Sequence, residues 1–485
     1  MQKRAVMWRA IVGAGLFGIG CADEGAPAPA PQQLEAGGVE ASSASARSTV
    51  TQFFVPPPDA AAVGQITSLI RRRDFGDALK LATMEATPRA VWFDGGTPQE
   101  VEKSVRQTME RAALAGRVPV LVAYDIPFRD CAQYSSGGAV DTASYEAWID
   151  GFAAGIGKRQ AVVILEPDSL GIIPWSGDWC QPTVTDSAGN TVNAPGADPA
   201  SRYAQLNYAV DKLAATAPKA LVYLDGTHSG WLNVGDASTR LASAGVARAE
   251  GFFLNISNYQ ITGNLAQYGT WISECLAYVT SVKPGDFGSC PNQYWNGGPL
   301  PSKIAQINGE WNGTGLDGNG AWSDSSDTVD LNTSGINLRY ANMLGTTAPT
   351  AHFIVDTSRN GHGPLNGAQY AAAPYDQPAT VTASLTSGNW CNPPGAGLGL
   401  RPSANTGIAL LDAYLWVKTP GQSDGACAIN GGARAWDFTA YNPWNVTGDA
   451  QNAFDPLWGA VDPAAGAWFP AQALQLAQEA VPALL

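Results

Sequence analysis

The amino-acid sequence predicts an α/β fold in which seven parallel strands form a barrel with long loops at its rim. Short runs of β-branched and aromatic residues alternate with stretches of helical pattern, as expected of βα units. Some runs, such as AVVIL at 161–165, are apolar throughout, which is typical of strands buried on both faces. Nearly every run also leads directly into a cluster of polar side chains.

The expected strands and helices follow from these patterns. The strands are Ala90–Phe93, Pro119–Tyr124, Ala161–Leu165, Ala220–Leu224, Phe252–Ile256, His352–Val355 and Ala413–Val417. The helices are Pro98–Ala115, Ala143–Ile156, Tyr203–Ala215 and Ala471–Ala480. The clearest helix start is at Pro98, because Thr97 supplies an N-cap and Glu100 follows it by three residues.

The polar clusters favour a closed barrel over an open sheet. In a barrel, the carboxyl ends of all strands meet at one rim, where active sites form. In an open sheet they would lie along an edge, and only the switch point would form a crevice. Residues 262–350 are the exception, because they are Gly-, Asn- and Trp-rich and mostly non-periodic. We expect them to be an insertion that decorates the rim.

Composition narrows the classes of ligand. The 485 residues include 42 acidic and 28 basic side chains, which gives a formal net charge of −14. An acidic surface repels phosphate backbones and anionic lipids, so nucleic-acid partners and electrostatic membrane binding are disfavoured. Only three histidines are present, which argues against a His-rich metal site, and the 16 tryptophans suggest flat, uncharged ligands.

The N-terminus has the pattern of an export signal, expected over residues 1–21. Basic residues precede a short apolar run that ends in Gly20-Cys21 and is too short to span a bilayer. Cys21 is a candidate lipid-accepting cysteine, with ordinary cleavage nearby as the alternative. Residues 22–49 are rich in Ala, Pro, Ser and Gly and are expected to form a flexible tether. The barrel domain then occupies 50–485, and the protein is secreted or held at the cell surface as a lipoprotein.

Six further cysteines indicate three disulfides in an exported chain. The sequence leaves many pairings open, and sequential pairing is the simplest. No CxxC motif occurs, so zinc and dithiol redox sites are disfavoured. The cysteines are Cys131, Cys180, Cys275, Cys290, Cys391 and Cys427.

The polar side chains at the strand ends are mainly carboxylates. Paired carboxylates without a His or Cys partner suit glycoside hydrolysis, in which one acid protonates the leaving oxygen and a second carboxylate acts as base or nucleophile. Carboxylates crowded at one mouth raise each other's pKa, which keeps one of them protonated. A single such aspartate is also explained as a helix cap or ion-pair partner, whereas the whole set is not. The set is Asp125, Asp130, Glu166, Asp168, Asp225, Asp356 and Asp424, with the basic residues Arg129, Arg359 and Lys418 among them.

Tryptophans near the strand ends suggest a sugar ligand. Trp92, Trp231 and Trp390 offer flat indoles that can cover the apolar face of a pyranose ring, although a single Trp is often a core residue. The basic residues interleaved with the acidic ones argue against Ca²⁺ or Mg²⁺, so no metal or cofactor is expected. No GxSxG, HExxH or P-loop motif occurs.

At these residues the chain resembles glycoside hydrolase family 6, the inverting β-1,4-glucanases. The resemblance covers essentially residues 50–485 and implies a distorted, TIM-like (β/α) barrel of seven parallel strands, with no cofactor and with cellulose or another β-1,4-glucan as partner. The matching stretches, in the order of the family, are AYDIPFRDC (123–131), ILEPDSL (164–170), YLDGTHSGWL (223–232), NISNYQ (255–260), DTSRNGHGP (356–364), WCNPPGAGLGLRPSANTG (390–407) and LWVKTPGQSDG (415–425).

The resemblance implies a role for each matching position. Asp168 corresponds to the general acid, and Asp130 to the aspartate that tunes the pKa of that acid. Tyr124 corresponds to the ring that distorts the sugar, and Ser136 to a serine that positions the attacking water. Asp225 is a further active-site carboxylate. Asp424 corresponds to the proposed base, with Arg359 and Lys418 as its basic neighbours. The implied substrate-binding residues also include Trp92, His228, Trp231, Asn258 and Trp390.

The resemblance also implies two disulfides, Cys131–Cys180 and Cys391–Cys427, which leaves Cys275–Cys290 as an extra bridge in the insertion. The chain departs from the family pattern at Ala139, at Gln422 and after Trp231, where a second tryptophan is absent. These departures concern subsites rather than the reaction.

The long rim segments 171–200, 262–350 and 425–470 favour a roofed tunnel, and hence a cellobiohydrolase that releases cellobiose from non-reducing ends. An endo-β-1,4-glucanase is the alternative on the same fold. A non-catalytic glucan-binding surface protein is a weaker one, since the positions of the acid and the base are both filled.

Overall fold

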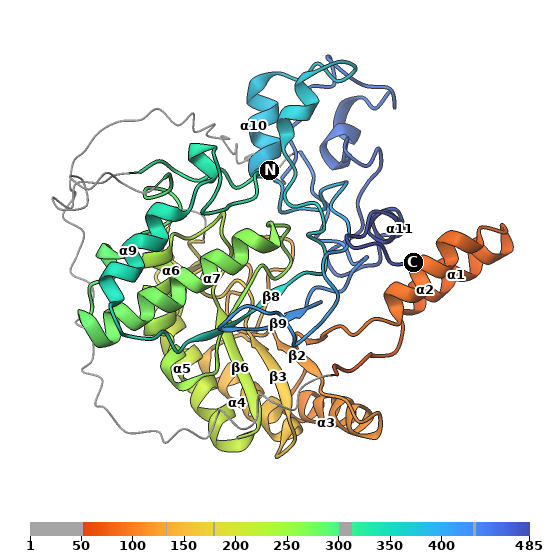
Figure 1. Ribbon diagram of the computed structural model, residues 1–485. Helices are drawn as coiled ribbons and strands as arrows, with labels where there is room; N and C mark the ends of the chain where they lie inside the picture. Colours follow the sequence, from red (N-terminus) through yellow and green to blue (C-terminus); the bar gives the residue numbers. More distant parts are fainter. Residues whose placement is uncertain (1–51, 132, 178–179, 300–312, 430–432) are drawn as a thin grey trace. The chain divides into compact units, whose positions relative to one another are not determined.

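The core of the protein is an all-parallel seven-stranded sheet (Figure 1). The computed structural model describes residues 52–131, 133–177, 180–299, 313–429 and 433–485. The expected export signal (1–21), the tether (22–49) and Cys21 lie outside these residues. In sheet order the strands are β1 (Val91–Phe93), β2 (Val120–Ala123), β3 (Ala161–Leu165), β6 (Ala220–Asp225), β7 (Gly251–Leu254), β8 (His352–Asp356) and β9 (Leu411–Leu415).

The two edge strands, β1 and β9, approach each other beside the sheet. The backbone N–H of Ala90, just before β1, donates to the carbonyl of Trp416, just after β9, at 2.9 Å. The indole N–H of Trp92 likewise donates to the carbonyl of Val417 at 2.8 Å. The sheet is therefore a curled, distorted barrel, and the predicted seven parallel strands are confirmed with bounds that differ by at most two residues.

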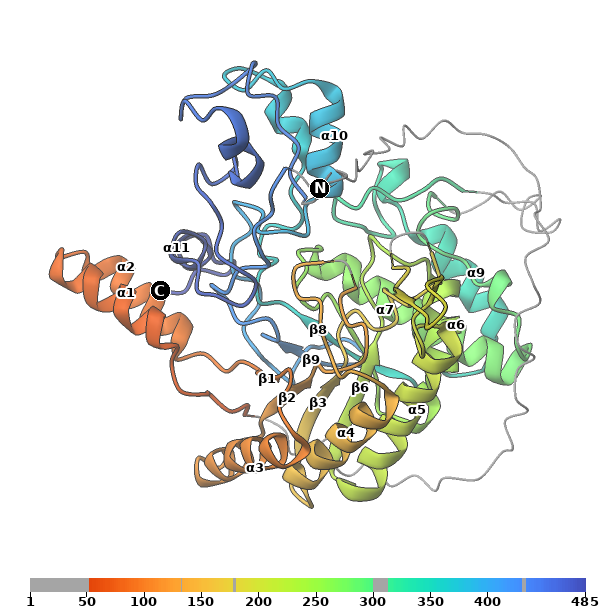
Figure 2. The same ribbon diagram turned by 180° about the vertical axis from the view of Figure 1, so that it is seen from behind.

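The outer face of this barrel is covered by α3 (Pro98–Leu114), α4 (Thr142–Ile156), α5 (Pro199–Thr216), α6 (Val234–Ser243), α7 (Thr262–Ala277) and α9 (Ser334–Leu344) (Figures 1 and 2). The helices α1 (Ala60–Arg71) and α2 (Phe75–Glu85) project to one side and share an apolar cluster with α11 (Pro470–Gln478), whereas α10 (Ala379–Ser387) stands apart from the sheet. Thr97 caps α3 together with Glu100 in the capping box that the sequence predicts. A small exposed hairpin, β4 (Thr183–Thr185) with β5 (Thr191–Asn193), follows β3. None of the described helices has the length and apolar character needed to span a bilayer.

Alternate residues of each strand belong to two separate cores. On β3, Val163 and Leu165 pack outward against the helices, whereas Val162 and Ile164 point into the barrel with Tyr124. This period of two explains why AVVIL is apolar at every position. Side chains fill the middle of the barrel, so cavities open at its two ends: one of about 560 Å³ at the carboxyl ends of the strands, and one of about 430 Å³ at the other end, beside Val162 and Ile354.

The sequence predicts that residues 262–350 are an insertion that decorates the rim, but part of this segment forms the wall of the barrel. It contains α7 and α9, and α7 packs on the sheet through Leu265, Tyr268 and Trp271. The sequence pattern conceals α7 because 11 of its 16 residues are buried, so that no polar face alternates with an apolar stripe. Helices α7 and α9 therefore both belong to the barrel wall.

Candidate active site

A cavity of about 560 Å³ opens at the carboxyl ends of the strands. Segments that follow six of the seven strands contribute to its wall, together with the insertion between β7 and β8. Its lining includes Trp92, Tyr124, Asp130, Asp168, His228, Trp231, Asn258, Trp390, Lys418 and Asp424. Ten of the thirteen catalytic and substrate-binding residues that the sequence predicts are thus brought together.

The backbone at these strand ends takes unusual conformations. Glu166, Asp168 and Asp130 have positive φ angles of 55°, 63° and 45°, and Asn255 and Ser257 after β7 have 71° and 59°. Residues other than glycine adopt this left-handed region at a cost of order 1 kcal/mol or more each. Such residues gather at active sites, where the strained turn directs a side chain that a relaxed chain would direct elsewhere.

Asp168 lies at the wall of the cavity, partly buried. Burial raises its pKa well above the ordinary value, and the carboxylates of Asp225 and Asp130 raise it further. The positive charge of Lys418 opposes this only in part. A raised pKa favours the protonated carboxylic acid, which is the form that a proton donor needs.

Asp130 and Tyr124 lie on the same side of the cavity. Asp130 accepts the backbone N–H of Ser135 at 2.8 Å, and burial raises its pKa. The ring of Tyr124 contacts Trp92 edge-on at 5.4 Å between centroids, and the guanidinium of Arg129 lies 4.7 Å from the tyrosine centroid. Tyr124 is thus held rigidly between an indole and a cation, with its edge on the cavity.

Asp424 has the opposite electrostatic setting. Two hydrogen bonds from Arg359, at 3.0 and 2.8 Å, and the ammonium of Lys418 at 3.5 Å neutralise its charge. The hydroxyl of Tyr259 and the backbone N–H of Asn392 donate to the same carboxylate. Although burial opposes ionisation, Arg359 and Lys418 outweigh it and hold the pKa of Asp424 below its ordinary value. The surroundings therefore favour the protonated form of Asp168 and the ionised form of Asp424 on the same cavity.

Several strand-end carboxylates serve the scaffold instead. Glu166, which is 0% exposed, accepts the N–H groups of Asp125 and Ile126. Asp356 accepts those of Val417 and Lys418. These carboxylates satisfy backbone donors at neighbouring strand ends and do not line the cavity.

Asp225 also lies below the surface of the cavity. It accepts the N–H groups of Leu170, Gly171 and Thr227, and burial raises its pKa to about 6. Asp225 is therefore close enough to act on Asp168 electrostatically, but it is placed to hold the turn that carries Asp168.

The tryptophans form separate parts of the cavity wall. Trp231 lies against Gly171, where an added Cβ would come within 2.4 Å of the indole, so that only glycine permits this approach. Trp390 lies near Tyr134, with ring centroids 6.3 Å apart. Beside Trp231, burial lowers the pKa of His228, so its imidazole is neutral. The cavity thus offers aromatic surfaces and uncharged polar groups around a few charges.

Three predicted site residues do not line the cavity. Arg359 and Asp225 lie beneath it, in contact with Asp424 and with the Asp168 turn respectively. Ser136 is exposed, whereas its neighbour Ser135 lines the cavity.

Sequence reasoning also missed part of the wall. Tyr294, Leu316 and Trp322 come from the insertion, where no periodicity marked them, and Trp322 stacks on Trp271 of α7 at 5.7 Å. Tyr259 lies in the stretch NISNYQ, but its hydrogen bond to Asp424 joins residues 165 positions apart. Only the family resemblance of that stretch could have marked Tyr259.

The three disulfides form as predicted. Cys131–Cys180 joins the segment after β2 to the segment after β3, and Cys391–Cys427 joins the segments after β8 and β9. Cys275–Cys290 joins the end of α7 to the chain that follows it. The first two bridges connect rim segments that carry candidate catalytic residues.

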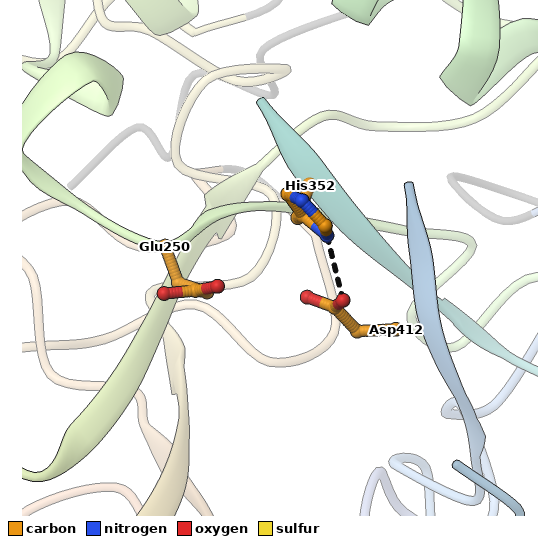
Figure 3. A group of neighbouring side chains, drawn as sticks. All are labelled: Glu250, His352 and Asp412. Atoms are coloured by element: carbon orange, nitrogen blue, oxygen red, sulfur yellow. Dashed lines mark hydrogen bonds and ion pairs between the residues drawn. The ribbon is translucent and has the colours of Figure 1, made fainter. Parts of the chain in front are cut away.

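Two groups of side chains in the described residues have ligand atoms close enough to face one cation. Glu250, His352 and Asp412 form the first, at the amino ends of the strands (Figure 3). There, however, Asp412 already accepts from Tyr223 and pairs with His352, both at 2.7 Å. Asp455, Asp462 and Cys427 form the second, in which Cys427 is half of a disulfide. None of these six lines the cavity.

Comparison with known proteins places the chain among carbohydrate-active enzymes. A model of glycosyl hydrolases family 6 matches residues 48–480. Endoglucanase 1 of Streptomyces sp. (strain KSM-9) is 30% identical over 340 residues, which cover 70% of this chain and 64% of that protein. A probable 1,4-beta-D-glucan cellobiohydrolase C of Neosartorya fischeri is 28% identical over 420 residues, covering 83% and 72%. The matches span only 52% to 64% of the length of three of the bacterial endoglucanases.

Solved structures agree with this placement. The endoglucanase Cel6 from Mycobacterium tuberculosis, in complex with a thio-linked cello-oligosaccharide, superposes with a TM-score of 0.53 at 26% identity, over 89% of this chain and 98% of that one. The catalytic core of the cellobiohydrolase Cel6A from Chaetomium thermophilum shares the fold, with a TM-score of 0.53 at 21% identity over 90% and 99%. With its curled sheet of seven parallel strands and a family match over most of its length, the chain belongs to glycosyl hydrolase family 6.

Proposed function

We propose that this protein is a cellulase that hydrolyses β-1,4-glucosidic bonds with inversion of the anomeric carbon. The observation that carries the proposal is the pair formed by Asp168 and Asp424 on one cavity. The first is kept protonated by burial and neighbouring carboxylates, and the second is kept ionised by Arg359 and Lys418. Two carboxyl groups with opposite protonation states are what an acid–base displacement at a glycosidic carbon requires.

In this mechanism Asp168 gives its proton to the glycosidic oxygen as the bond to the anomeric carbon breaks. A water molecule attacks the opposite face of the sugar, and its oxygen forms the new bond. The proton that this water loses passes to the Asp424 carboxylate, and exchange with solvent then restores both groups. Tyr124, held by Trp92 and Arg129, is placed to constrain the sugar at the point of cleavage.

The substrate is a neutral glucan chain. Indoles at Trp92, Trp231 and Trp390 supply flat apolar surfaces for pyranose rings, and Asn258 and His228 supply uncharged hydrogen-bonding groups beside them. An acidic chain of net charge −14 has no electrostatic obstacle to an uncharged polymer.

We further propose that cleavage proceeds from a chain end, with cellobiose as the product. The segments after β2 and β9 meet beside the cavity, where the hydroxyl of Tyr134 accepts the N–H of Ala428 at 3.2 Å. Gly425, at a φ of 137°, lies so close to Tyr134 that a Cβ would come within 2.4 Å of its ring. Trp322 and Tyr294 of the insertion extend another wall. These contacts support a roofed passage through which a chain is threaded rather than an open cleft.

Product analysis tests each part of this proposal. With phosphoric-acid-swollen cellulose, chromatography should show cellobiose as the main soluble product from the earliest times. Proton NMR of the first product should show the α-anomer, as inversion requires. Early release of longer oligosaccharides, with a rapid fall in the viscosity of carboxymethyl cellulose, would establish the endo alternative. Tight binding without any product would establish a glucan-binding protein.

The disulfides and the family together indicate an extracellular enzyme, and we propose that residues 1–21 direct export. Mass spectrometry of the mature protein tests this, because cleavage before a lipid-modified Cys21 and cleavage elsewhere give different N-terminal masses.

A further inference from the structure

Behind Asp424, away from the cavity, lies a second pair of carboxylates that the proposed mechanism does not use. Asp455 is 0% exposed and Asp462 is 5% exposed, and their carboxylate oxygens come within 4.8 Å of one another. Both belong to the rim segment between β9 and α11. A buried pair of like-charged groups is costly, so its presence calls for a physical explanation.

Among the described residues, one cation is paired with this dyad. The guanidinium of Arg434, also buried, forms two hydrogen bonds of 3.1 Å from its Nε to Asp455. In the part of the chain that the structure describes, Asp462 forms no salt bridge, and its Oδ1 has no hydrogen-bond donor. Two carboxylates beside one guanidinium carry one negative charge in excess, and a proton held between them removes that excess.

The dyad and its arginine converge on Asn392. The side-chain amide of Asn392 donates to Asp462 at 3.1 Å, and Arg434 donates to the carbonyl of Asn392 at 3.0 Å. The indole of Trp458 donates to the same carbonyl at 2.7 Å. Asn392 is 0% exposed, so that none of these bonds is exchanged for bonds to water.

Asn392 in turn holds Asp424 from two directions. Its backbone N–H donates to the carboxylate of Asp424 at 3.0 Å, and its side-chain oxygen accepts the backbone N–H of Asp424 at 2.8 Å. This reciprocal pair joins residues 32 positions apart, next to the Cys391–Cys427 disulfide. A displacement of Asn392 would therefore move the carboxylate that faces the substrate.

We propose that Asp462 is a positioning residue for the reaction: it shares one proton with Asp455 beside Arg434 and holds Asn392 in the place where Asn392 fixes Asp424. The expected effect on catalysis rests on the proposed function, whereas the shared proton does not. Burial and the neighbouring Asp455 raise the pKa of Asp462 to about 8, in agreement with the charge count. The other ionisable groups that act on the dyad are Arg434, Tyr134 and Tyr370, with Asp424 beyond Asn392.

The kinetic test compares Asp462→Ala, Asp462→Asn and the control Asp449→Ala, which alters an exposed aspartate of the same rim segment. With cellotetraose as substrate, D462A should lower kcat about tenfold with little change in KM, because a small displacement of a catalytic group is costly. D462N should recover most of this loss, since an amide reproduces the donor and the acceptor of a protonated carboxyl. D449A should match the wild type. Wild-type kcat in a folded D462A, or equal losses in D462A and D462N, would overturn the proposal.

The shared proton can be tested through thermal stability, without measuring enzyme activity. Because the folded-state pKa of Asp462 lies above its unfolded value, the folded protein holds a proton that the unfolded chain releases, and this stability is lost as pH rises through about 8. From about pH 5 to about pH 9, the Tm of the wild type should fall relative to that of D462N by about 3 °C or more. Parallel Tm curves would refute the shared proton, even if D462A fails to fold. An inactive wild type with diverging curves would instead refute the proposed function alone.

Discussion

Arg359 binds the carboxylate of Asp424 through two hydrogen bonds, while 0% of the arginine side chain and 7% of the aspartate side chain are exposed. The guanidinium also lies 4.5 Å from the ring centroid of Tyr259, whose hydroxyl donates to the same carboxylate. Arginine, carboxylate and phenol therefore form one rigid unit in which the charge of Asp424 is fixed before any substrate arrives.

Replacing Arg359 by methionine should remove the ion pair with Asp424 on which this unit depends. Asp424 would keep Lys418 but lose its main counter-charge, so its pKa should rise and the acid limb of the kcat profile should move to higher pH. Breaking a buried pair typically costs about 3 kcal/mol or more of unfolding free energy, which denaturant titration measures. Arg248→Met, at an exposed ion pair with Asp211, is the control and should cost less than about 1 kcal/mol. An unchanged acid limb in a folded R359M would show that Arg359 does not set the charge of Asp424.

Removing the carboxyl of Asp168 should lower the rate of hydrolysis without lowering the stability of the fold. Asp168→Ala should lower kcat on cello-oligosaccharides by about 10³-fold, as expected for loss of a general acid. An aryl cellobioside whose leaving group needs no proton should be affected much less. The Tm should not fall, since a carboxyl that is costly to ionise is removed. Equal losses on both substrates would contradict the role of Asp168 as proton donor.

The charge of Asp225 should affect the alkaline limb of the pH profile of kcat/KM. Asp225 is the neighbouring charge with the largest effect on Asp168, and its own pKa of about 6 makes it an anion at higher pH. Asp225→Asn should therefore lower the pKa of Asp168 and move the alkaline limb of kcat/KM down by roughly 1 unit. The exposed Asp211→Asn, measured in parallel, should leave the limb in place. If the alkaline limb of kcat/KM does not move in a folded D225N, a group other than Asp168 produces that limb.

The contact between Gly171 and Trp231 should control sugar binding. A methyl group at position 171 would come within 2.4 Å of the indole, so Gly171→Ala must displace that ring from the cavity wall. We expect KM for cellotetraose to rise about tenfold, since one stacking contact is worth roughly 1 kcal/mol or more. Gly263→Ala, where a Cβ would meet nothing within 4 Å, should leave KM unchanged. An unaltered KM in G171A would show that Trp231 does not contribute to sugar binding.

The sequence predicts the strands well because each is a short apolar run that ends in a charge. For β3 the predicted bounds are those observed, and Asp168 follows at the rim as expected. Helix α7 was missed for the opposite reason: buried on most of its surface, it has no amphipathic pattern to recognise. The hairpin of α1 and α2 was missed as well, although Asp59 and Asp74 cap both helices.

The sequence predicts a site residue only where a motif indicates both its place in the fold and its chemical role. EPDSL places Asp168 directly after β3, whereas Asp424 in SDG lies further along the segment after β9 and is marked by the family resemblance. The strand-end pattern does not distinguish Asp225, which accepts backbone N–H groups beneath the cavity, from Asp168, which faces it; only the family resemblance gives them different roles. The contact between Asn392 and Asp462 has no sequence signal, because it joins residues 70 positions apart and depends on the folded rim.

The two disulfides at the rim make the mouth of the barrel and its sheet respond differently to reduction. Cys131–Cys180 and Cys391–Cys427 tie together segments that carry Asp130 and Asp424, whereas the seven strands are held by hydrogen bonds and apolar packing. A thiol reductant should therefore disable turnover while circular dichroism still reports intact secondary structure. An enzyme built this way depends on an oxidising environment for its catalytic geometry more than for its architecture.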